Sequence, residues 1–361
     1  MKTNINRLFS IIYYLSACFL LCGCITEYQV TGIDGFSNIL VVEGIITDVE
    51  SNIRLSRSTE NLTASIIELQ YINNAKVYVE CDDGTQRIAE NPNPTTPRNG
   101  LYLIKTGQLN FERKYRLKIV IFDHEYCSEF TYPIKTPEID SIFWSKKSIG
   151  QPVRIHLTTH STESENLYCR WLYREDWQII SEYYLEDYPY RCWDRTNNVE
   201  ILIGSAEKKV FGKVSEIIRE IPPSDKILSV LYRIDVKQNA ISKKAYDYWN
   251  NVKKNSEQIG SIFAPIPSEI SGNITCITDR NIPVIGYIDV STTTQYRRYI
   301  SRWDGAYEKP TSWCKPIPPE KIPEDDGRYY VYYKDDLWLH IYCVDCTNSA
   351  RYITKPDDWL Y

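Results

Sequence analysis

The sequence predicts an all-β (mainly β) protein. An N-terminal immunoglobulin-like or transthyretin-like β-sandwich is followed by a C-terminal β-rich barrel or sandwich with one packed helix. Three observations support this prediction. Tyr is abundant, with 29 residues in a chain of 361, and Tyr, Val, Ile and Thr favour strands. Short alternating segments recur with turn residues between them. Clear helical spacing of apolar residues occurs in one segment, 242–252.

The first 24 residues have the layout of a secretory signal. Lys2 and Arg7 precede an apolar run over 8–21, which is too short for a stable membrane span. The Leu-Cys-Gly-Cys sequence at 21–24 resembles the lipobox of bacterial lipoproteins, in which the cysteine after the small residue is lipidated. We therefore expect a signal peptide at 1–23, lipidation of Cys24 with acyl chains such as palmitate, and a lipidated tether at 24–37.

The first predicted domain is a β-sandwich over residues 38–137. Strands are predicted at 39–47, 75–81, 101–103 and 115–121, and Asp-Asp-Gly-Thr at 82–85 is a hairpin turn signal. Strands at this spacing favour a small sandwich of about 100 residues. The prolines at 133 and 137 mark its expected end.

Residues 138–361 form the second predicted domain, which is also rich in strands. Alternation predicts strands at 168–173, 286–290 and 297–300. One helix interrupts them, because Ser242 is a suitable N-cap and the apolar residues Ala245, Tyr248, Trp249 and Val252 follow at helical spacing.

The cysteine content agrees with export. Two cysteines leave with the signal, one takes the lipid, and eight remain. An even number in an exported chain predicts disulfides, although eight cysteines allow 105 complete pairings. Cys81 and Cys127 are the candidate pair in the first domain, whereas Cys314 lies near Cys343 and Cys346 in the second. Free buried thiols are the alternative for several of these residues.

Aromatic residues are concentrated between positions 171 and 193. Their flat apolar faces and polar groups suit binding of sugar rings or peptides, although they also fill sheet cores. Tyrosines at 183 and 184 point to opposite faces if the chain is extended, which leaves one outside the core. The candidate ligand-binding residues are therefore Trp177, Tyr183, Tyr184 and Tyr188, with core packing as the alternative.

The sequence contains no recognised catalytic or metal-binding motif. The histidines at 124, 156, 160 and 340 have no metal-ligand spacing, and Cys343-x-x-Cys346 has no second pair of ligands for zinc. We therefore expect no enzymatic activity, no metal and no cofactor. Carboxylates beside aromatic residues, at 175–176 and 186–187, leave a glycan- or peptide-directed hydrolase as the third hypothesis.

Several short segments of the chain form a distinctive set. The central ones are YRIDVKQ at 232–238, AYDYW at 245–249, GSIF at 260–263, GNI at 272–274 and GY at 286–287. VVEG at 41–44, CW at 192–193, and the closing Cys343-x-x-Cys346 with Pro356 and Trp359 accompany them. Together these segments resemble the lipoproteins catalogued as domain of unknown function 4249 (DUF4249). The resemblance spans roughly residues 24–361. It implies an outer-membrane lipoprotein of Bacteroidota, often encoded beside TonB-dependent transporters, and it implies no catalytic residue.

We accordingly expect an outer-membrane-anchored lipoprotein that acts as a non-enzymatic accessory or ligand-binding partner of a TonB-dependent transporter system. The alternative is a structural or adhesive surface protein. The formal net charge of −5 argues against nucleic acid as a partner. The acidic run that follows the lipid cysteine in surface-exposed relatives is reduced here to Glu27. The sequence therefore does not decide whether the protein lies on the cell-surface or the periplasmic face of the outer membrane.

Overall fold

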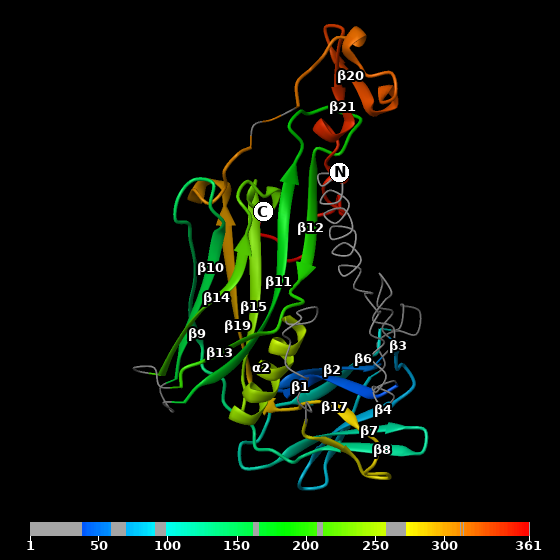
Figure 1. Cartoon of the computed structure of the whole chain (residues 1–361), viewed down its shortest axis with the longest axis vertical. Helices are drawn as coiled ribbons and strands as arrows, with labels where there is room; N and C mark the ends of the chain where they lie inside the picture. The colour runs from blue at the N-terminus through cyan, green and yellow to red at the C-terminus, as the bar shows by residue number, and fades with distance from the viewer. Residues whose placement is uncertain are drawn as a thin grey trace, which may run out of the picture.

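The computed structural model describes residues 38–58, 70–90, 99–161, 166–207, 212–257, 272–310, 312 and 314–360. These residues form an elongated molecule that is mainly β, as the sequence predicts. One sandwich lies at one end, a second forms the middle, and a hairpin stands at the opposite end (Figure 1). No helix within the described ranges has both the length and the apolar character needed to cross a membrane.

The N-terminal sandwich consists of two sheets that face each other across an aliphatic core. The first sheet contains β17 (Val284–Gly286), β1 (Leu40–Thr47), β2 (Val49–Arg57), β3 (Gln70–Tyr71), β6 (Leu101–Gly107) and β18 (Val290–Ser291). The second contains β16 (Ile274–Cys276), β8 (His124–Ser128), β7 (Tyr115–Ile121), β4 (Lys76–Cys81) and β5 (Gln86–Ile88). Alternation builds the core: in β7, for example, Leu117, Ile119 and Ile121 are buried while their neighbours are more exposed.

Three strands of this sandwich come from the second half of the chain. β17 and β18 pair with β1 in parallel, and β16 pairs with β8 in antiparallel orientation. The division at 137/138 is therefore wrong for residues 274–291, which complete the first sandwich. The strand predicted at 286–290 is also interrupted. It breaks after Gly286, whose φ is 153° and whose added Cβ would meet the Val42 carbonyl oxygen at 2.5 Å.

The second sandwich encloses the largest core cluster of the described residues. One sheet contains β14 (Lys213–Ile221), β10 (Val153–His160) and β9 (Ile139–Ser145). The other contains β12 (Arg191–Asn197), β11 (Tyr168–Ile180), β15 (Leu231–Ala240), β19 (Thr293–Ser301) and β13 (Leu202–Ser205). The described strands form a sandwich and do not close into a barrel. On β15, Tyr232 and Ile234 point into the core, so Arg233 and Asp235 point to the outer face.

The helix α2 (Lys243–Glu257) lies between the two sandwiches. Its buried residues Tyr248 and Trp249 pack with Tyr168 of β11 and with Tyr287, so one cluster joins the two domains. Ser242 caps the helix, because its hydroxyl oxygen accepts a hydrogen bond from the backbone N–H of Ala245 at 3.1 Å. The predicted N-cap and apolar face are thus confirmed.

Asp289 lies at this junction and is only 4% exposed. Its carboxylate accepts a hydrogen bond from the backbone N–H of Ser242 at 2.7 Å. Burial raises the pKa of Asp289 to about 6, and the hydrogen bonds from Ser242 only partly oppose the shift. The folded protein therefore retains a proton that the unfolded chain releases near its ordinary pKa of 3.8. Stability should consequently decrease as the pH rises from about 4 to 6.

Asp289→Asn should remove this decrease and raise the free energy of unfolding at pH 8 by up to about 3 kcal/mol. The amide oxygen can keep the hydrogen bond without carrying a buried charge. Urea unfolding of both proteins between pH 4 and 8 measures the difference, with Asp247→Asn on the exposed face of α2 as the control. If the free energy of unfolding changed with pH in the same way in the wild type and in Asp289→Asn, the raised pKa of Asp289 would be contradicted.

A hairpin module (residues 314–349) occupies the far end of the molecule (Figure 1). It contains β20 (Tyr330–Lys334), β21 (Leu337–His340) and the 3-10 turns η4 (Pro319–Lys321), η5 (Gly327–Tyr329), η6 (Ile341–Cys343) and η7 (Cys346–Asn348). The Cys314–Cys343 disulfide closes the module, and the Cys192–Cys346 disulfide attaches it to β12. The predicted proximity of Cys314 to the Cys343/Cys346 end is confirmed. The turns η2 (Lys226–Leu228) and η3 (Arg302–Asp304) lie outside this module.

The predicted pairing of Cys81 with Cys127 is wrong, because both are free buried thiols. Cys81 ends β4 and Cys127 lies on β8, and β7 runs between these two strands. Strands two positions apart in a sheet are separated by about 10 Å, which exceeds the reach of a disulfide. Burial raises the pKa of Cys127 to about 11, so this thiol stays protonated and a poor nucleophile.

Candidate functional site

The four aromatic residues proposed for ligand binding do not form one surface. Trp177 is half-buried and packs against the core of the second sandwich. Tyr183 and Tyr188 pack together against the cluster around the Cys314–Cys343 disulfide, and the Tyr183 hydroxyl donates to the Cys314 carbonyl oxygen at 3.3 Å. Tyr184 is 66% exposed and contacts Tyr190 edge-on. The structure therefore brings two of them together as packing residues and separates the other two.

Of the carboxylates in the hydrolase hypothesis, Glu175 and Asp176 are held in ion pairs on opposite faces of β11, whereas those at 186–187 are exposed in the loop that follows. Glu175 points between the sheets, where it accepts from Arg219 at 2.9 Å and from the Tyr232 hydroxyl at 2.5 Å. Asp176 points outward and accepts from Arg233 at 2.9 Å. Both side chains are almost fully buried and cannot face a common substrate.

Histidines make two surface contacts on β10. His156 is hydrogen-bonded to the Ser145 hydroxyl at 2.7 Å, and His160 to Asp140 at 2.7 Å. In the described part of the chain no carboxylate orients His156 as a base. The residues described also contain no group of three or more His, Cys, Asp or Glu side chains placed to hold a metal ion.

A C-terminal clasp (residues 356–360) covers the outer face of the β11–β15–β19 sheet. Arg233 is completely buried beneath it, with Trp359 stacked over its guanidinium at 5.3 Å. Asp358 lies 3.0 Å from Arg233 and 2.6 Å from Arg297. Burial alone would raise the pKa of Asp358, but hydrogen bonds from Arg297 and Arg233 outweigh it and lower the pKa to about 2. The ion pairs of this cluster hold the C-terminal clasp against the sheet.

Beside the clasp, an open groove of about 910 Å³ separates the second sandwich from Arg54 of the N-terminal sandwich. Its walls include Leu172, Asn198, Lys237 and Tyr296. This groove is broad, and Val199 on its wall is 95% exposed. It therefore lacks the enclosed shape of a ligand site.

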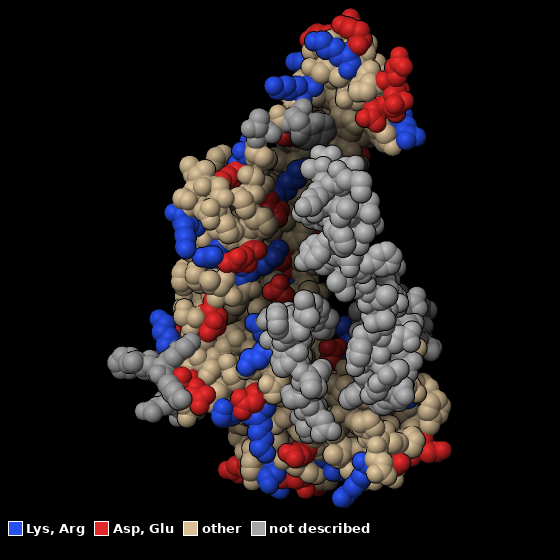
Figure 2. Space-filling view, viewed as in Figure 1, with Lys and Arg blue, Asp and Glu red and all other residues tan. Residues whose placement is uncertain are grey.

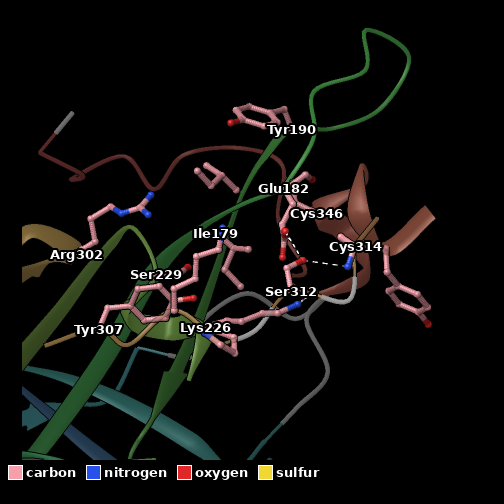
Figure 3. A pocket seen from close by; sticks show the side chains of 16 residues that line it. Ile179, Glu182, Tyr190, Lys226, Ser229, Arg302, Tyr307, Ser312, Cys314 and Cys346 are labelled. Carbon is pink, nitrogen blue, oxygen red and sulfur yellow. Dashed lines mark hydrogen bonds between the residues drawn. The ribbon is translucent and has the colours of Figure 1, made fainter. Parts of the chain in front are cut away.

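The tip pocket is the more enclosed site. It has a volume of about 210 Å³ and lies where the ends of β11, β15 and β19 meet the hairpin module (Figure 3). Its lining joins segments far apart in sequence: Ile179, Ile180, Ser181, Glu182, Tyr190, Lys226, Ser229, Arg302, Tyr307, Lys309, Pro310, Ser312, Cys314, Tyr342, Cys346 and Ser349. Figure 3 shows Arg302 and Tyr307 on one side of the pocket and Glu182 and Ser312 on the other.

Both disulfides shape this pocket, since Cys314 and Cys346 line it. Ser312 donates to the Glu182 carboxylate at 2.5 Å and accepts from the Cys314 backbone N–H at 3.0 Å, which fixes that wall. Lys226 donates to the Ser349 hydroxyl at 3.3 Å, which connects η2 to the end of the hairpin module. The arrangement offers hydroxyl groups, tyrosine rings and cationic groups around one small cavity.

Of the pocket residues, Cys314 and Cys346 were singled out from the sequence as possible disulfide cysteines, and none was proposed for ligand binding. The proposed aromatic stretch does run alongside the site, because Glu182 and Tyr190 belong to the same loop as Tyr183 and Tyr184. The basic wall comes from η2, η3 and the segment after it, whose proximity depends on the pairing of β15 with β19. Cys24 lies outside the described residues.

The family model for domain of unknown function 4249 matches residues 25–297, about three quarters of the chain. The chain belongs to the DUF4249 family. The match covers the N-terminal sandwich and ends within β19, so it does not reach 361 as the resemblance suggested. In this DUF4249 protein, the hairpin module, the clasp and the Arg302 side of the tip pocket follow the matched region. No curated protein matches the chain.

Proposed function

We propose that this DUF4249 protein is an outer-membrane lipoprotein of Bacteroidota that serves a TonB-dependent transporter as a non-enzymatic, ligand-binding accessory. The observation that supports binding most directly is the tip pocket, a small cavity built on two disulfides and lined by side chains that recognise ligands. Disulfides persist in oxidising compartments outside the cytoplasm, in keeping with the signal-like residues 1–24.

The layout of the molecule suits an anchored binding protein. The described part of the chain begins in the N-terminal sandwich, where β1 starts at Leu40 opposite Arg57. The tip pocket lies at the other end of the long axis (Figure 1). A lipid on Cys24 would leave that pocket free to meet a ligand or a transporter.

Cys24→Ser should abolish labelling by radioactive palmitate and release the protein from the membrane fraction, whereas Cys22→Ser should change neither. The two cysteines are two positions apart in the same segment, so the second variant is a matched control. Purification of the tagged wild type from mild detergent should recover a TonB-dependent transporter. Label retained in Cys24→Ser would disprove the anchor, and repeated purification without any transporter would disprove the accessory role.

A further inference from the structure

Three basic side chains surround the tip pocket without an acidic partner. Lys226, Arg302 and Lys309 line it, and no carboxylate of the described residues lies within ion-pair distance of any of them. Glu182, the one acidic residue of the lining, is instead hydrogen-bonded to Ser312. From this geometry we infer that the tip pocket binds a small organic anion, and the inference rests on the proposed role of the pocket as a binding site.

The arginines beneath the clasp differ from the basic residues of the tip pocket, because they are paired with aspartates. On the sheet beneath the clasp, Arg174, Arg233 and Arg297 are each within 4.0 Å of at least one aspartate. Acidic side chains also gather on the hairpin module beside the pocket, as Figure 2 shows, and the exposed ones include Glu324, Asp325, Asp326, Asp335 and Asp336. Their presence nearby does not neutralise the pocket. Like charges around one cavity repel each other, and an anion between them relieves that repulsion.

The hydroxyl groups and the apolar wall narrow the class of anion. Ser229 has a buried hydroxyl oxygen with no hydrogen-bond partner among the described residues, and Ser349 faces Lys226. Ile179, Ile180 and Pro310 provide apolar surface, and the lining includes three tyrosine rings. Such a lining favours an organic body with an acidic group over a bare inorganic ion. The volume of about 210 Å³ admits one unit the size of a monosaccharide or an amino acid, because sites for drug-sized ligands start at about 300 Å³.

Arg302 is the residue best placed to recognise the acidic group. Its side chain is half-buried at the end of β19, whereas Lys226 and Lys309 are exposed at the rim. A guanidinium can bind a carboxylate through two parallel hydrogen bonds, and partial burial strengthens such bonds. In Figure 3 the guanidinium extends toward the pocket from the side opposite Glu182.

The test is calorimetric titration of the full-length chain in detergent with two matched pairs of probes, glucuronate against glucose and phenylacetate against phenylacetamide. At least one acid should bind about tenfold or more tightly than its neutral counterpart, and this affinity should fall as salt is added. Inorganic phosphate should bind more weakly than that acid. Equal binding of acid and neutral probes, binding of neither acid, or tighter binding of phosphate would overturn the inference.

Arg302→Gln should weaken binding of the preferred acid about tenfold or more, and Arg328→Gln should leave it unchanged. Arg328 is an exposed arginine of the hairpin module outside the pocket lining, stacked on Tyr329. Matching melting temperatures of the variants and the wild type show that both fold. Unchanged affinity in Arg302→Gln would overturn the assignment. Failure of the Cys24 or transporter experiments alone would refute the proposed accessory role while leaving this binding result intact.

Discussion

Replacing Cys192 and Cys346 together by alanine should lower the free energy of unfolding by about 5 kcal/mol. In the chain-entropy account, a disulfide stabilises the folded state by restricting the unfolded chain, and the effect grows with the length of the loop that it closes. This bridge joins residues 154 positions apart, whereas Cys314–Cys343 spans only 29 positions. The corresponding Cys314/Cys343 double variant should therefore lose less, about 3.5 kcal/mol.

Urea unfolding of the two double variants and the wild type checks this order. Cys81→Ala removes a free thiol and serves as the control for mutating a buried cysteine. Because Cys346 and Cys314 both line the tip pocket, each double variant should also bind the preferred acid more weakly than the wild type does. A larger loss from the shorter bridge would show that loop closure does not govern the stability of this protein.

Local pattern was sufficient to predict some of the strands, because the alternation of buried and exposed residues depends on the environment of each strand alone. The segment 115–121 is β7, and Ser242 with Ala245, Tyr248 and Trp249 gives the start and the buried face of α2. Such features depend on neighbours within about one turn or two residues. The all-β class and the location of the helix could therefore be predicted before any tertiary contact was known.

Sheet partners could not be predicted in the same way. Nothing within residues 274–291 indicates that β17 would lie beside β1, some 240 positions earlier in the chain. The same limitation explains the Cys81 and Cys127 error, because the intervening β7 becomes visible only in the assembled sheet. The tip pocket was missed for this reason too. Its basic residues lie far apart in sequence and meet only after β15 pairs with β19.

The buried charge cluster could be recognised only once the register of the paired strands β11, β15 and β19 was known. On adjacent strands Asp176 lies opposite Arg233, and Asp235 lies opposite both Arg174 and Arg297. Cross-strand pairs of opposite charge stabilise a sheet, and here they form a ladder across three strands. The clasp adds Asp358 and Trp359 on top of this ladder, and it thereby removes Arg233 from solvent.

Asp176→Asn should lower the free energy of unfolding by about 3–5 kcal/mol, the usual cost of removing one partner from a buried ion pair. Four arginines (174, 195, 233 and 297) face three aspartates (176, 235 and 358) in this cluster, which leaves an excess of one positive charge. Loss of Asp176 doubles that excess around a fully buried guanidinium. Arg233→Met instead balances the charges and leaves Asp176 paired with Arg174 at 2.9 Å, so it should cost less.

The Asp176→Leu/Arg233→Met double variant should then be more stable than Asp176→Asn alone, because no unpaired charge remains buried. Equilibrium unfolding in urea at pH 7 measures these three variants together with Asp176→Leu, and Glu220→Gln provides the control. Glu220 pairs with Arg154 at 2.6 Å, but both side chains are at least a third exposed, so this loss should stay below about 1 kcal/mol. If Asp176→Asn proved as mild as Glu220→Gln, burial under the clasp would not strengthen the pair. If the double variant lost the sum of its single losses, the two residues would act independently. A buried ladder requires coupling between them, since the charge of each residue stabilises the charge of the other.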